Sequence, residues 1–478
     1  MRSGVKAGNA GAEANAAAEI AGALRTLALA VASVAPGPGG LAGEAETVAE
    51  GGSWHPAAIV RHSPRGKPDF IGAVVKVSAG SQAMSLAPEV ASAIDRAVDA
   101  RAAELSSLSG RIHANPELRF EEHQASAWLS EFIVSRGHAV ERGIAGMPTA
   151  FRARAGKAGN DGPRIAILAE YDALPGVGHA CGHNLIAAGA VGAFVAAAEV
   201  VEFTAGELLL LGTPAEEGGG GKITLIEAGV FADVNAAMMF HPFDRDLLAH
   251  RALASLWLTV DFKGRPSHAA IAPHAGRSAL TACLDTFRLV DGQRLHFRDG
   301  VRVHGYVTDG GQAVNIIPER AACEFSVRAL DGDELTRVRG IVERCARGAA
   351  LASDVEVTIN VRQGYRDMVN NMALARRFGA HATALGRQPA ETDETIGAGS
   401  TDMGDVSHVV PCIHPWLAIV GAGEALCHEH RFAEAAAGET GVKTALLAAK
   451  AMARTAVDYL ADAELRAAVS AEWNAARR

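Results

Sequence analysis

The sequence has no run of Lys or Arg, although 45 of its 478 residues are basic. Asp and Glu outnumber them at 54, which gives a formal net charge of −9. Proteins that bind nucleic acid or an anionic membrane surface through charge usually carry basic clusters. The composition therefore argues against both kinds of partner.

Paired cysteines and long apolar runs are lacking as well. No apolar run reaches the roughly 20 residues that a membrane-spanning helix needs. Disulfide frameworks need closely patterned cysteines, and scattered ones are typical of a reducing compartment. We therefore expect reduced thiols and a cytoplasmic location. The six cysteines lie singly along the chain, at Cys181, Cys283, Cys323, Cys345, Cys412 and Cys427.

The composition changes near residue 87. Residues 1–86 are rich in Ala and Gly and of low complexity, so we expect a disordered extension. From Ala87 onward apolar residues recur at helical steps, which predicts one apolar helical stripe from Val90 to Ile112. Short apolar runs such as "RIAILAEYD" then alternate with helical patterns such as "LIAAGAVGAFVAAAEVV". This order predicts an α/β fold, a mostly parallel sheet with helices on both faces.

A second pattern begins at about Ala254. In "SLWLTVDF" and two later stretches, apolar and polar residues alternate strictly, which is typical of antiparallel strands with one buried face. The stretch "GRSALTACLDTFRLV" predicts a helix behind that sheet. We therefore predict a catalytic domain formed by residues 87–252 and 367–478, interrupted by an α+β insertion at 253–366. A cleft between two such domains is a natural binding site.

Side chains that bind metals follow four of the strand-like runs. Each could be a packed or solvated residue on its own. Because the carboxyl ends of parallel strands share one edge of a sheet, four such groups together predict a metal site there. Adjacent Glu216 and Glu217 point in different directions from extended backbone, so one can bind metal while the other faces a substrate water. The candidates are Cys181, His183, Glu216, Glu217, His241, Cys427, His428 and His430.

Three stretches, "YDALPGVGHACGHN", "GTPAEEGGGGK" and "GSTDMGDVSHVVPCIHPW", resemble the aminoacylase/carboxypeptidase G family of metallopeptidases. They are most similar to its amidohydrolase branch, which includes p-aminobenzoyl-glutamate hydrolase and aminoacylase-like β-alanyl dipeptidases. The resemblance runs from "ELSSLSGRIHANPELRFEE" to the C-terminal helix. It implies a fold of the di-zinc exopeptidase type with the insertion as a lid domain.

The resemblance also implies a site. Glu216 would be the general base, and Asp172 would support the metal site from beside it. In the lid domain, His268 would reach the scissile carbonyl, in many relatives that of the partner's site. Asn315 and Arg328 would hold the carbonyl and the carboxylate of the substrate. Two divalent ions, Zn²⁺, Mn²⁺ or Co²⁺, would be bound by Cys181, His183, Glu217, His241 and His428.

Two positions depart from the family pattern. Asn184 follows "HACGH" where many relatives have Asp, which favours the dipeptidase-like branch. Near the C-terminus both His428 and His430 are present where one ligand is expected, and we choose His428 from its spacing to Phe432. Four further histidines are expected to be structural, namely His274, His304, His408 and His414.

The sequence thus predicts a metal-dependent amidohydrolase that cleaves a dipeptide or an N-acyl amino acid with a free carboxylate. By resemblance it would form a homodimer through the lid domain. Two alternatives remain open. One is a non-catalytic relative that binds metal or ligand, and the other is a cysteine hydrolase with Cys181 as the nucleophile. The sequence does not name the acyl group or the amino acid.

Overall fold

The computed structural model describes residues 86–159, 162–202 and 204–477. The chain divides into two units, Met1–Arg61 and His62–Arg478. The first unit lies outside the described residues, and so does nearly all of the extension predicted for residues 1–86.

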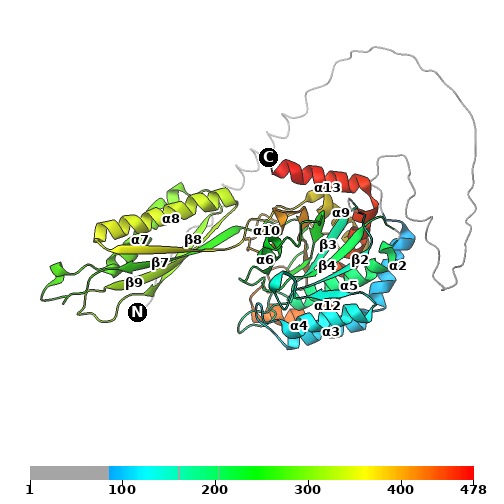
Figure 1. The fold of residues 1–478 in the computed structure, drawn as a ribbon, viewed down its shortest axis with the longest axis horizontal. Coiled ribbons are helices and arrows are strands. Elements are labelled where there is room, and N and C mark those ends of the chain that lie inside the picture. Colours follow the sequence, from blue (N-terminus) through cyan, green and yellow to red (C-terminus); the bar gives the residue numbers. More distant parts are fainter. Residues whose placement is uncertain (1–85, 160–161, 203, 478) are drawn as a thin grey trace, which may run out of the picture. The chain divides into compact units, whose positions relative to one another are not determined.

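A six-stranded sheet organises the larger part of the fold (Figure 1). Strands β4, β3, β5 and β11 run parallel, whereas β2 and β1 pair antiparallel at one end. The predicted, mostly parallel sheet is confirmed. In the order in which they lie side by side, the strands are β1 (Val140–Arg142), β2 (Phe151–Gly156), β4 (Glu207–Gly212), β3 (Arg164–Ala169), β5 (Ala236–Met238) and β11 (Cys412–Ile413).

Both faces of this sheet are covered, as predicted. Along β3, Ile165 and Ile167 belong to one hydrophobic core and Ala166 and Leu168 to another. This is why the strand reads as a continuous apolar run rather than an alternating one. The first core is filled by α5 (His183–Val201), α12 (Glu439–Ala461), α2 (Pro88–Asp99), α3 (Ala102–Ala114), α4 (His123–Ser135), α9 (Met372–Ala384), α11 (His430–Ala437) and α13 (Ala463–Ala476), and the second by α6 (Gly221–Glu227) and α10 (Met403–Ser407).

Helix α5 is the central helix of the first core. Among the described residues it alone is long and apolar enough to cross a membrane by length and composition, but 94% of that apolar window is buried inside the protein. It packs against α12, α2 and α3 and against the sheet. The stripe predicted from Val90 to Ile112 is divided between α2 and α3, because the chain leaves the helix at Ala100 and Arg101. The predicted stripe therefore belongs to two helices rather than one.

The second pattern forms a four-stranded antiparallel sheet, also as predicted. Its order is β10 (Glu356–Gln363), β7 (Ala254–Lys263), β9 (Arg320–Ala329) and β8 (Arg302–Asp309), and helices α7 (Ala279–Gln293) and α8 (Gly332–Ser353) pack against it. Strand β8 was not predicted, because Val303 is its only buried residue and no apolar alternation marks it.

A short two-stranded parallel sheet contributes residues to the pocket described below. It pairs β6 (His241–Phe243) with β12 (Trp416–Ala418). The apolar run "VNAAMMFHPFD" is divided between β5 and β6, with a break between Met238 and His241. The break moves His241 from the large sheet to the small one.

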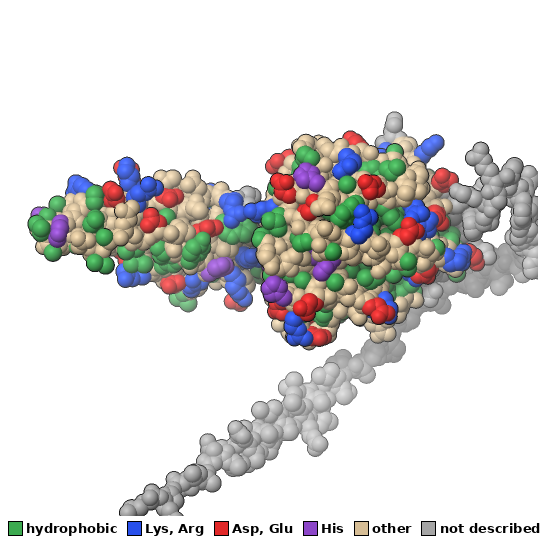
Figure 2. All heavy atoms as spheres, turned by 90° about the horizontal axis from the view of Figure 1, so that it is seen from below, with side chains coloured by type: hydrophobic (Ala, Val, Ile, Leu, Met, Phe, Trp, Pro, Cys, Tyr) green, Lys and Arg blue, Asp and Glu red, His purple; other side chains and the backbone are tan. Residues whose placement is uncertain are grey.

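The surface carries mixed charge. On the face drawn in Figure 2, side chains of Lys and Arg are interspersed with those of Asp and Glu, without a broad patch of either sign. This agrees with the absence of basic runs in the sequence.

Close packing around α5 gives a test of the fold. A methyl group at Gly189 would lie 2.6 Å from the ring of Phe240 and 3.3 Å from the carbonyl oxygen of Ala445. Overpacking of this kind costs about 1–3 kcal/mol, so we expect Gly189→Ala to lower the free energy of unfolding by that amount in urea denaturation.

Gly110→Ala is the matched control. Gly110 lies within α3, and nothing lies within 4 Å of the added methyl group. Ala favours a helix by about 1 kcal/mol over Gly, so this variant should be as stable as the parent or more stable. Equal stability of the two variants would contradict the packing described for α5.

Candidate active site

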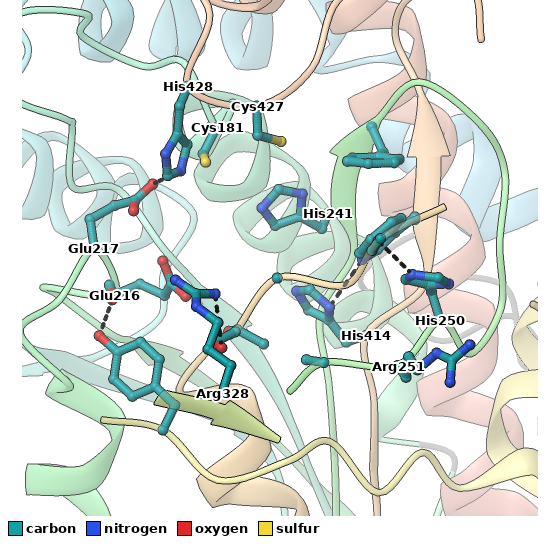
Figure 3. A pocket seen from close by; sticks show the side chains of 18 of the residues that line it. Cys181, Glu216, Glu217, His241, His250, Arg251, Arg328, His414, Cys427 and His428 are labelled. Carbon is teal, nitrogen blue, oxygen red and sulfur yellow. Dashed lines mark hydrogen bonds and ion pairs between the residues drawn. The ribbon is translucent and has the colours of Figure 1, made fainter. Parts of the chain in front are cut away.

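The candidate site is a pocket lined by segments that are far apart in the sequence (Figure 3). The loop before α5, the loop after β4, strand β6 and the segment after β12 each contribute side chains. Strand β9 and the residues after β10 complete the wall. Among the lining residues are Cys181, Glu216, Glu217, His241, Arg328, Tyr365, His414, Trp416, Cys427 and His428.

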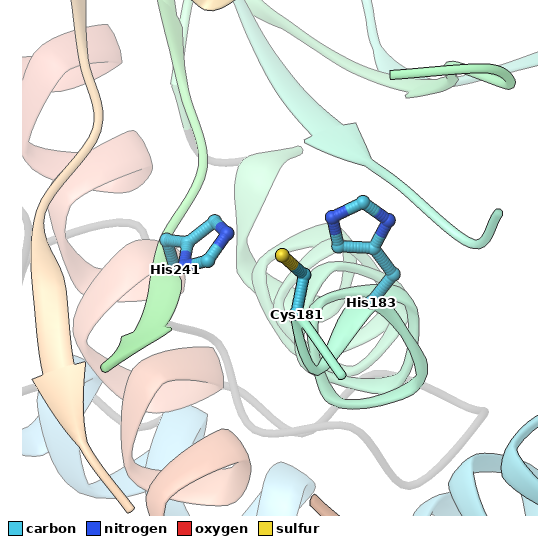
Figure 4. Close-up of side chains that lie close together, drawn as sticks. All are labelled: Cys181, His183 and His241. Carbon is cyan, nitrogen blue, oxygen red and sulfur yellow. The ribbon is translucent and has the colours of Figure 1, made fainter. Parts of the chain in front are cut away.

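The start of α5 presents two of the predicted ligands. Gly182 precedes the helix with a φ of 73°, and a methyl group there would lie 2.9 Å from the ring of Pro242. Glycine therefore permits both the left-handed turn and the close approach of β6. The result places Cys181 and His183 beside His241 (Figure 4).

Two sets of ligand atoms meet at Cys181. Its sulfur lies within 4.8 Å of ring nitrogens of His183 and His241, and also within 4.8 Å of ligand atoms of Glu217 and His428. The Cys181 sulfur therefore belongs to both sets, which together could hold two ions. The five predicted ligands are thus brought together.

Asp172 orients two of these ligands. Nδ1 of His183 lies 2.9 Å from the backbone oxygen of Asp172 and 3.1 Å from its Oδ1. The second carboxylate oxygen, Oδ2, accepts a hydrogen bond of 2.9 Å from the backbone N–H of Glu217. Partners of this kind fix the tautomer and direction of metal-binding histidines. The structure thus places Asp172 beside the ligands, where the resemblance puts it.

The turn that carries Glu216 and Glu217 is held from two sides. It begins at Ala215, whose φ is 61° and whose N–H donates to Oε1 of Glu122 at 2.9 Å. The hydroxyl of Tyr365 donates to the backbone oxygen of Glu216 and accepts from Gly218 N–H at 2.9 Å. Left-handed backbone at a non-glycine residue is sparsely populated, so these bonds stabilise a strained turn.

The two carboxyl groups of this turn have different neighbours. Oε1 of Glu217 lies 3.6 Å from Nε2 of His428. Burial acts to raise the pKa of Glu217, but nearby His428 and His183 outweigh it and lower that pKa. Burial and the adjacent Glu217 carboxylate raise the pKa of Glu216 well above its usual range. The charged form of Glu217 is thus favoured, as a metal ligand requires, whereas the pKa of Glu216 is raised, as is common for the carboxyl groups of general acid–base catalysts.

The residues fit divalent cations. Nε2 of His183 and Oε1 of Glu217 are buried and make no hydrogen bond among the described residues. Burial lowers the pKa of His241 to about 4, which keeps this imidazole neutral and able to bind a metal. The buried carboxyl groups of Glu170 and Asp402 both pair with Lys222, the one buried lysine in the described part of the chain. Carboxyl groups thus outnumber ammonium groups in this buried region, which favours the binding of cations. Sulfur, imidazole and carboxylate ligands together suit ions such as Zn²⁺.

Arg328 brings a positive charge from β9 to the pocket. Its Nη1 donates to Oγ of Ser400 at 3.2 Å, and no carboxylate of the described residues lies within ion-pair distance. Burial lowers the pKa of this guanidinium. A partly buried arginine without an anionic partner is suited to bind the carboxylate of a ligand.

His268 and Asn315 lie outside this pocket. They are neighbours in the insertion, where Ala269 N–H donates to the backbone oxygen of Asn315 at 2.9 Å. Nδ1 of His268 accepts from the N–H groups of Ala270 and Ile271 at 3.2 Å each. Their roles in the site stay predictions. His430 opens α11 and is not among the lining residues, whereas His428 is.

Comparison with known proteins decides the family. Residues 166–451 match the model of peptidase family M20/M25/M40. The chain is 37% identical to the Xaa-Arg dipeptidase of Mus musculus over 377 residues, which cover 76% of this chain and 87% of the relative. It belongs to the M20/M25/M40 peptidases.

Other relatives agree with this membership. A p-aminobenzoyl-glutamate hydrolase chain of Escherichia coli is 29% identical, over 78% of this chain and 92% of that protein. A dinuclear metal binding peptidase of the M20 family from Bacillus subtilis has a TM-score of 0.60 at 21% identity, covering 76% of this chain and 99% of that one. The family and fold predicted from the sequence are confirmed, and so is the prediction of a hydrolase acting on amide bonds.

Sequence reasoning missed some residues of this M20/M25/M40 member. Tyr365 and Glu122 hold the Glu216 turn, but no role was assigned to either of them, although Glu122 ends the stretch "ELSSLSGRIHANPELRFEE". His414, expected to be structural, lines the pocket, and its Nδ1 accepts from Trp416 Nε1–H at 3.3 Å. The available signal was the stretch "CIHPW", in which His414 stands between strands β11 and β12.

Glu122 gives a pH-dependent test of the turn. Burial and the nearby Asp172 raise the pKa of Glu122 to about 7, from about 4.5. The unfolded chain therefore loses this proton first, and stability falls as pH rises through that interval. The glutamine of Glu122→Gln does not titrate, so this loss is absent from the variant. From pH 5 to pH 8 the free energy of unfolding of the variant should therefore rise by about 1–3 kcal/mol relative to that of the parent.

Urea unfolding of both proteins at the two pH values is the measurement. Glu131→Gln removes an exposed carboxylate of α4 that has no ion pair among the described residues, and it serves as the control, with the same stability difference from the parent at both pH values. A Glu122→Gln variant whose stability changes with pH in parallel with the parent would argue against a protonated carboxyl at this position.

Proposed function

We propose that this protein hydrolyses the amide bond of a dipeptide or an N-acyl amino acid whose free carboxylate binds to Arg328. The observation that carries the proposal is the pair of ligand sets that share Cys181, with the carboxyl group of Glu216 beside them. The named activities of the relatives support a substrate of this class. We propose two divalent ions, Zn²⁺, Mn²⁺ or Co²⁺, held by Cys181, His183, Glu217, His241 and His428.

Bound ions would supply Lewis acidity, which polarises the scissile carbonyl and lowers the pKa of the attacking water. Residues of the chain bind the substrate and transfer the proton. Arg328 binds the substrate carboxylate and so sets the position of the amide. Glu216 accepts the proton of the attacking water and donates it to the leaving amine as the C–N bond breaks. Tyr365 and Glu122 hold the turn on which Glu216 lies.

Two features of the proposal come from the family resemblance. We propose a homodimer in which His268 and Asn315, on the insertion of one protomer, reach the site of its partner. The position of both residues outside this chain's own pocket supports that arrangement. We also propose that the protein is cytoplasmic, because its six cysteines are all free thiols.

The alternative of a cysteine hydrolase is less well supported. A contact with the Cys427 thiol, together with burial and the Glu217 carboxylate, raises the pKa of Cys181 well above its usual range. A nucleophilic cysteine needs the opposite shift. Cys181 is therefore better suited to bind a metal, which displaces the thiol proton.

Metal removal tests the activity itself. We expect dialysis against a strong chelator to abolish hydrolysis of a panel of dipeptides and N-acyl amino acids, including β-alanyl-lysine and p-aminobenzoyl-glutamate. Addition of Zn²⁺, Mn²⁺ or Co²⁺ should restore it. Turnover that persists in metal-free protein would contradict the proposal, and the substrate preferences of the reconstituted enzyme would identify the acyl group.

Glu216→Gln tests the base separately. Because the amide cannot accept a proton, we expect kcat to fall by about 10²–10⁴-fold while the metal content stays at the parent level. Glu217→Gln is the matched comparison, since it should release metal as well as activity. A Glu216→Gln variant with the turnover of the parent would favour a different base or a non-catalytic role for this pocket.

A further inference from the structure

His414 lines the pocket but has no part in the function proposed above. It is 5% exposed and lies between β11 and β12. The centroid of its ring is 5.3 Å from that of His241, yet its nitrogens belong to none of the candidate ligand sets among the described residues. The imidazole is therefore close to the proposed metal site without being one of its ligands.

The chain on the C-terminal side of His414 is held against β6. The backbone N–H of His241 donates to the oxygen of Pro415 at 2.8 Å, and Trp416 is paired with His241 in the two-stranded sheet. The indole ring of Trp416 packs against the ring of Phe243, with centroids 4.0 Å apart. These contacts fix the position of the indole beside the imidazole of His414.

A hydrogen bond from Trp416 decides which ring nitrogen of His414 carries the hydrogen. The indole Nε1–H donates to Nδ1 of His414 at 3.3 Å. An indole N–H is only a donor, so Nδ1 is an acceptor and carries no hydrogen, and the ring hydrogen is on Nε2. A ring nitrogen that carries a hydrogen offers no lone pair to a metal. His414 is therefore a hydrogen-bond donor at Nε2.

This donor has no partner in the described part of the chain. Nε2 of His414 is buried and makes no hydrogen bond there. An unpaired buried donor costs free energy, and buried polar groups in native structures are rarely left without a partner. Figure 3 shows this nitrogen directed away from the bond with Trp416, toward the side of the pocket where Glu216 and Arg328 lie. An acceptor bound in the pocket would supply the missing partner.

Resting on the proposed function, we propose that His414 donates a hydrogen bond from Nε2 to an oxygen atom of the substrate. A dipeptide or an N-acyl amino acid has two kinds of acceptor, the scissile carbonyl and the free carboxylate. At the carbonyl, the donor stabilises the negative charge that develops on the oxygen during attack. At the carboxylate, it adds to the hydrogen bonds of Arg328. Trp416 is then a positioning residue, because its N–H keeps the hydrogen of His414 on Nε2.

Two amide substitutions separate a donor from a structural residue. The amide of His414→Gln reaches about as far as Nε2 and can donate there, whereas that of His414→Asn reaches only about as far as Nδ1, where it can accept from Trp416. With the panel substrate that the parent cleaves best, we expect His414→Asn to lower kcat/KM by about 10–10³-fold and His414→Gln to retain most of it. A role confined to the contact with Trp416 predicts the reverse order. The reverse order, or equal kcat/KM of the two variants, would overturn the inference.

The separate kinetic constants of His414→Asn identify the oxygen. A fall in kcat at unchanged KM assigns the hydrogen bond to the carbonyl in the transition state, and a rise in KM at unchanged kcat assigns it to the carboxylate. Both variants should bind two ions per chain with the affinity of the parent. Loss of an ion from both folded variants would make His414 a metal ligand and overturn its role as a donor.

Nuclear magnetic resonance of the parent gives a test that depends on no variant. In protein with ¹⁵N-labelled histidine, the ring signals of His414 are identified by their contact with the indole N–H of Trp416. We expect the pattern of a neutral ring with its hydrogen on Nε2, and a hydrogen on Nδ1 or on both nitrogens would overturn the proposal. Trp416→Phe keeps an aromatic ring beside Phe243 but removes the N–H, so the preference for this tautomer should weaken. An unchanged preference would overturn the role of Trp416.

The activity of the parent separates this inference from the proposed function. A metal-loaded parent that hydrolyses no member of the panel overturns both. An active parent whose two His414 variants have equal kcat/KM overturns the role of His414 alone. Loss of activity in His414→Asn, with retention in His414→Gln and an unchanged metal content in both, supports the assignment.

Discussion

The geometry of the candidate site depends on one buried carboxylate, Asp172. Its oxygens contact the ring of His183 and the backbone N–H of Glu217, so a single side chain aligns the helix that follows one strand with the turn that follows its neighbour. Because β3 and β4 are parallel and paired in register, their carboxyl ends lie side by side, and Asp172 needs only to bridge them. The sheet thus brings these ligands together.

The sequence predicted most of the elements that build this edge. Runs such as Arg164–Ala169 and Glu207–Gly212 are apolar on both faces because both faces are covered, and this makes them visible without an alignment. The ligand types at the strand ends were equally visible, because four groups of this kind follow strands whose carboxyl ends share one edge of the sheet. The alternation in Ala254–Lys263 likewise predicted the second sheet.

What the sequence did not show depends on contacts between distant segments. Strand β8 pairs by its backbone and leaves every residue except Val303 exposed, so no apolar pattern marks it. Glu122 and Tyr365 reach the Glu216 turn from far along the chain, and their importance lies in the backbone groups that they contact. Asn184 has a simpler account than membership of a branch. Its amide donates to Ser109 and to the backbone oxygen of Ala436, which an aspartate could not do.

The residues where the chain enters and leaves the insertion have a wider consequence. The N–H of Ser255 donates to the backbone oxygen of Tyr365 at 2.8 Å, and the N–H of Tyr365 donates to Oγ of Ser255 at 3.2 Å. A methyl group at Gly364 would lie 2.3 Å from the backbone oxygen of Ser255. The hydroxyl of Tyr365 then contacts the turn that carries Glu216. The inserted segment is therefore coupled to the turn that carries Glu216. Replacing it with the insertion of another enzyme would preserve this turn only if the replacement kept the contacts of Ser255, Gly364 and Tyr365.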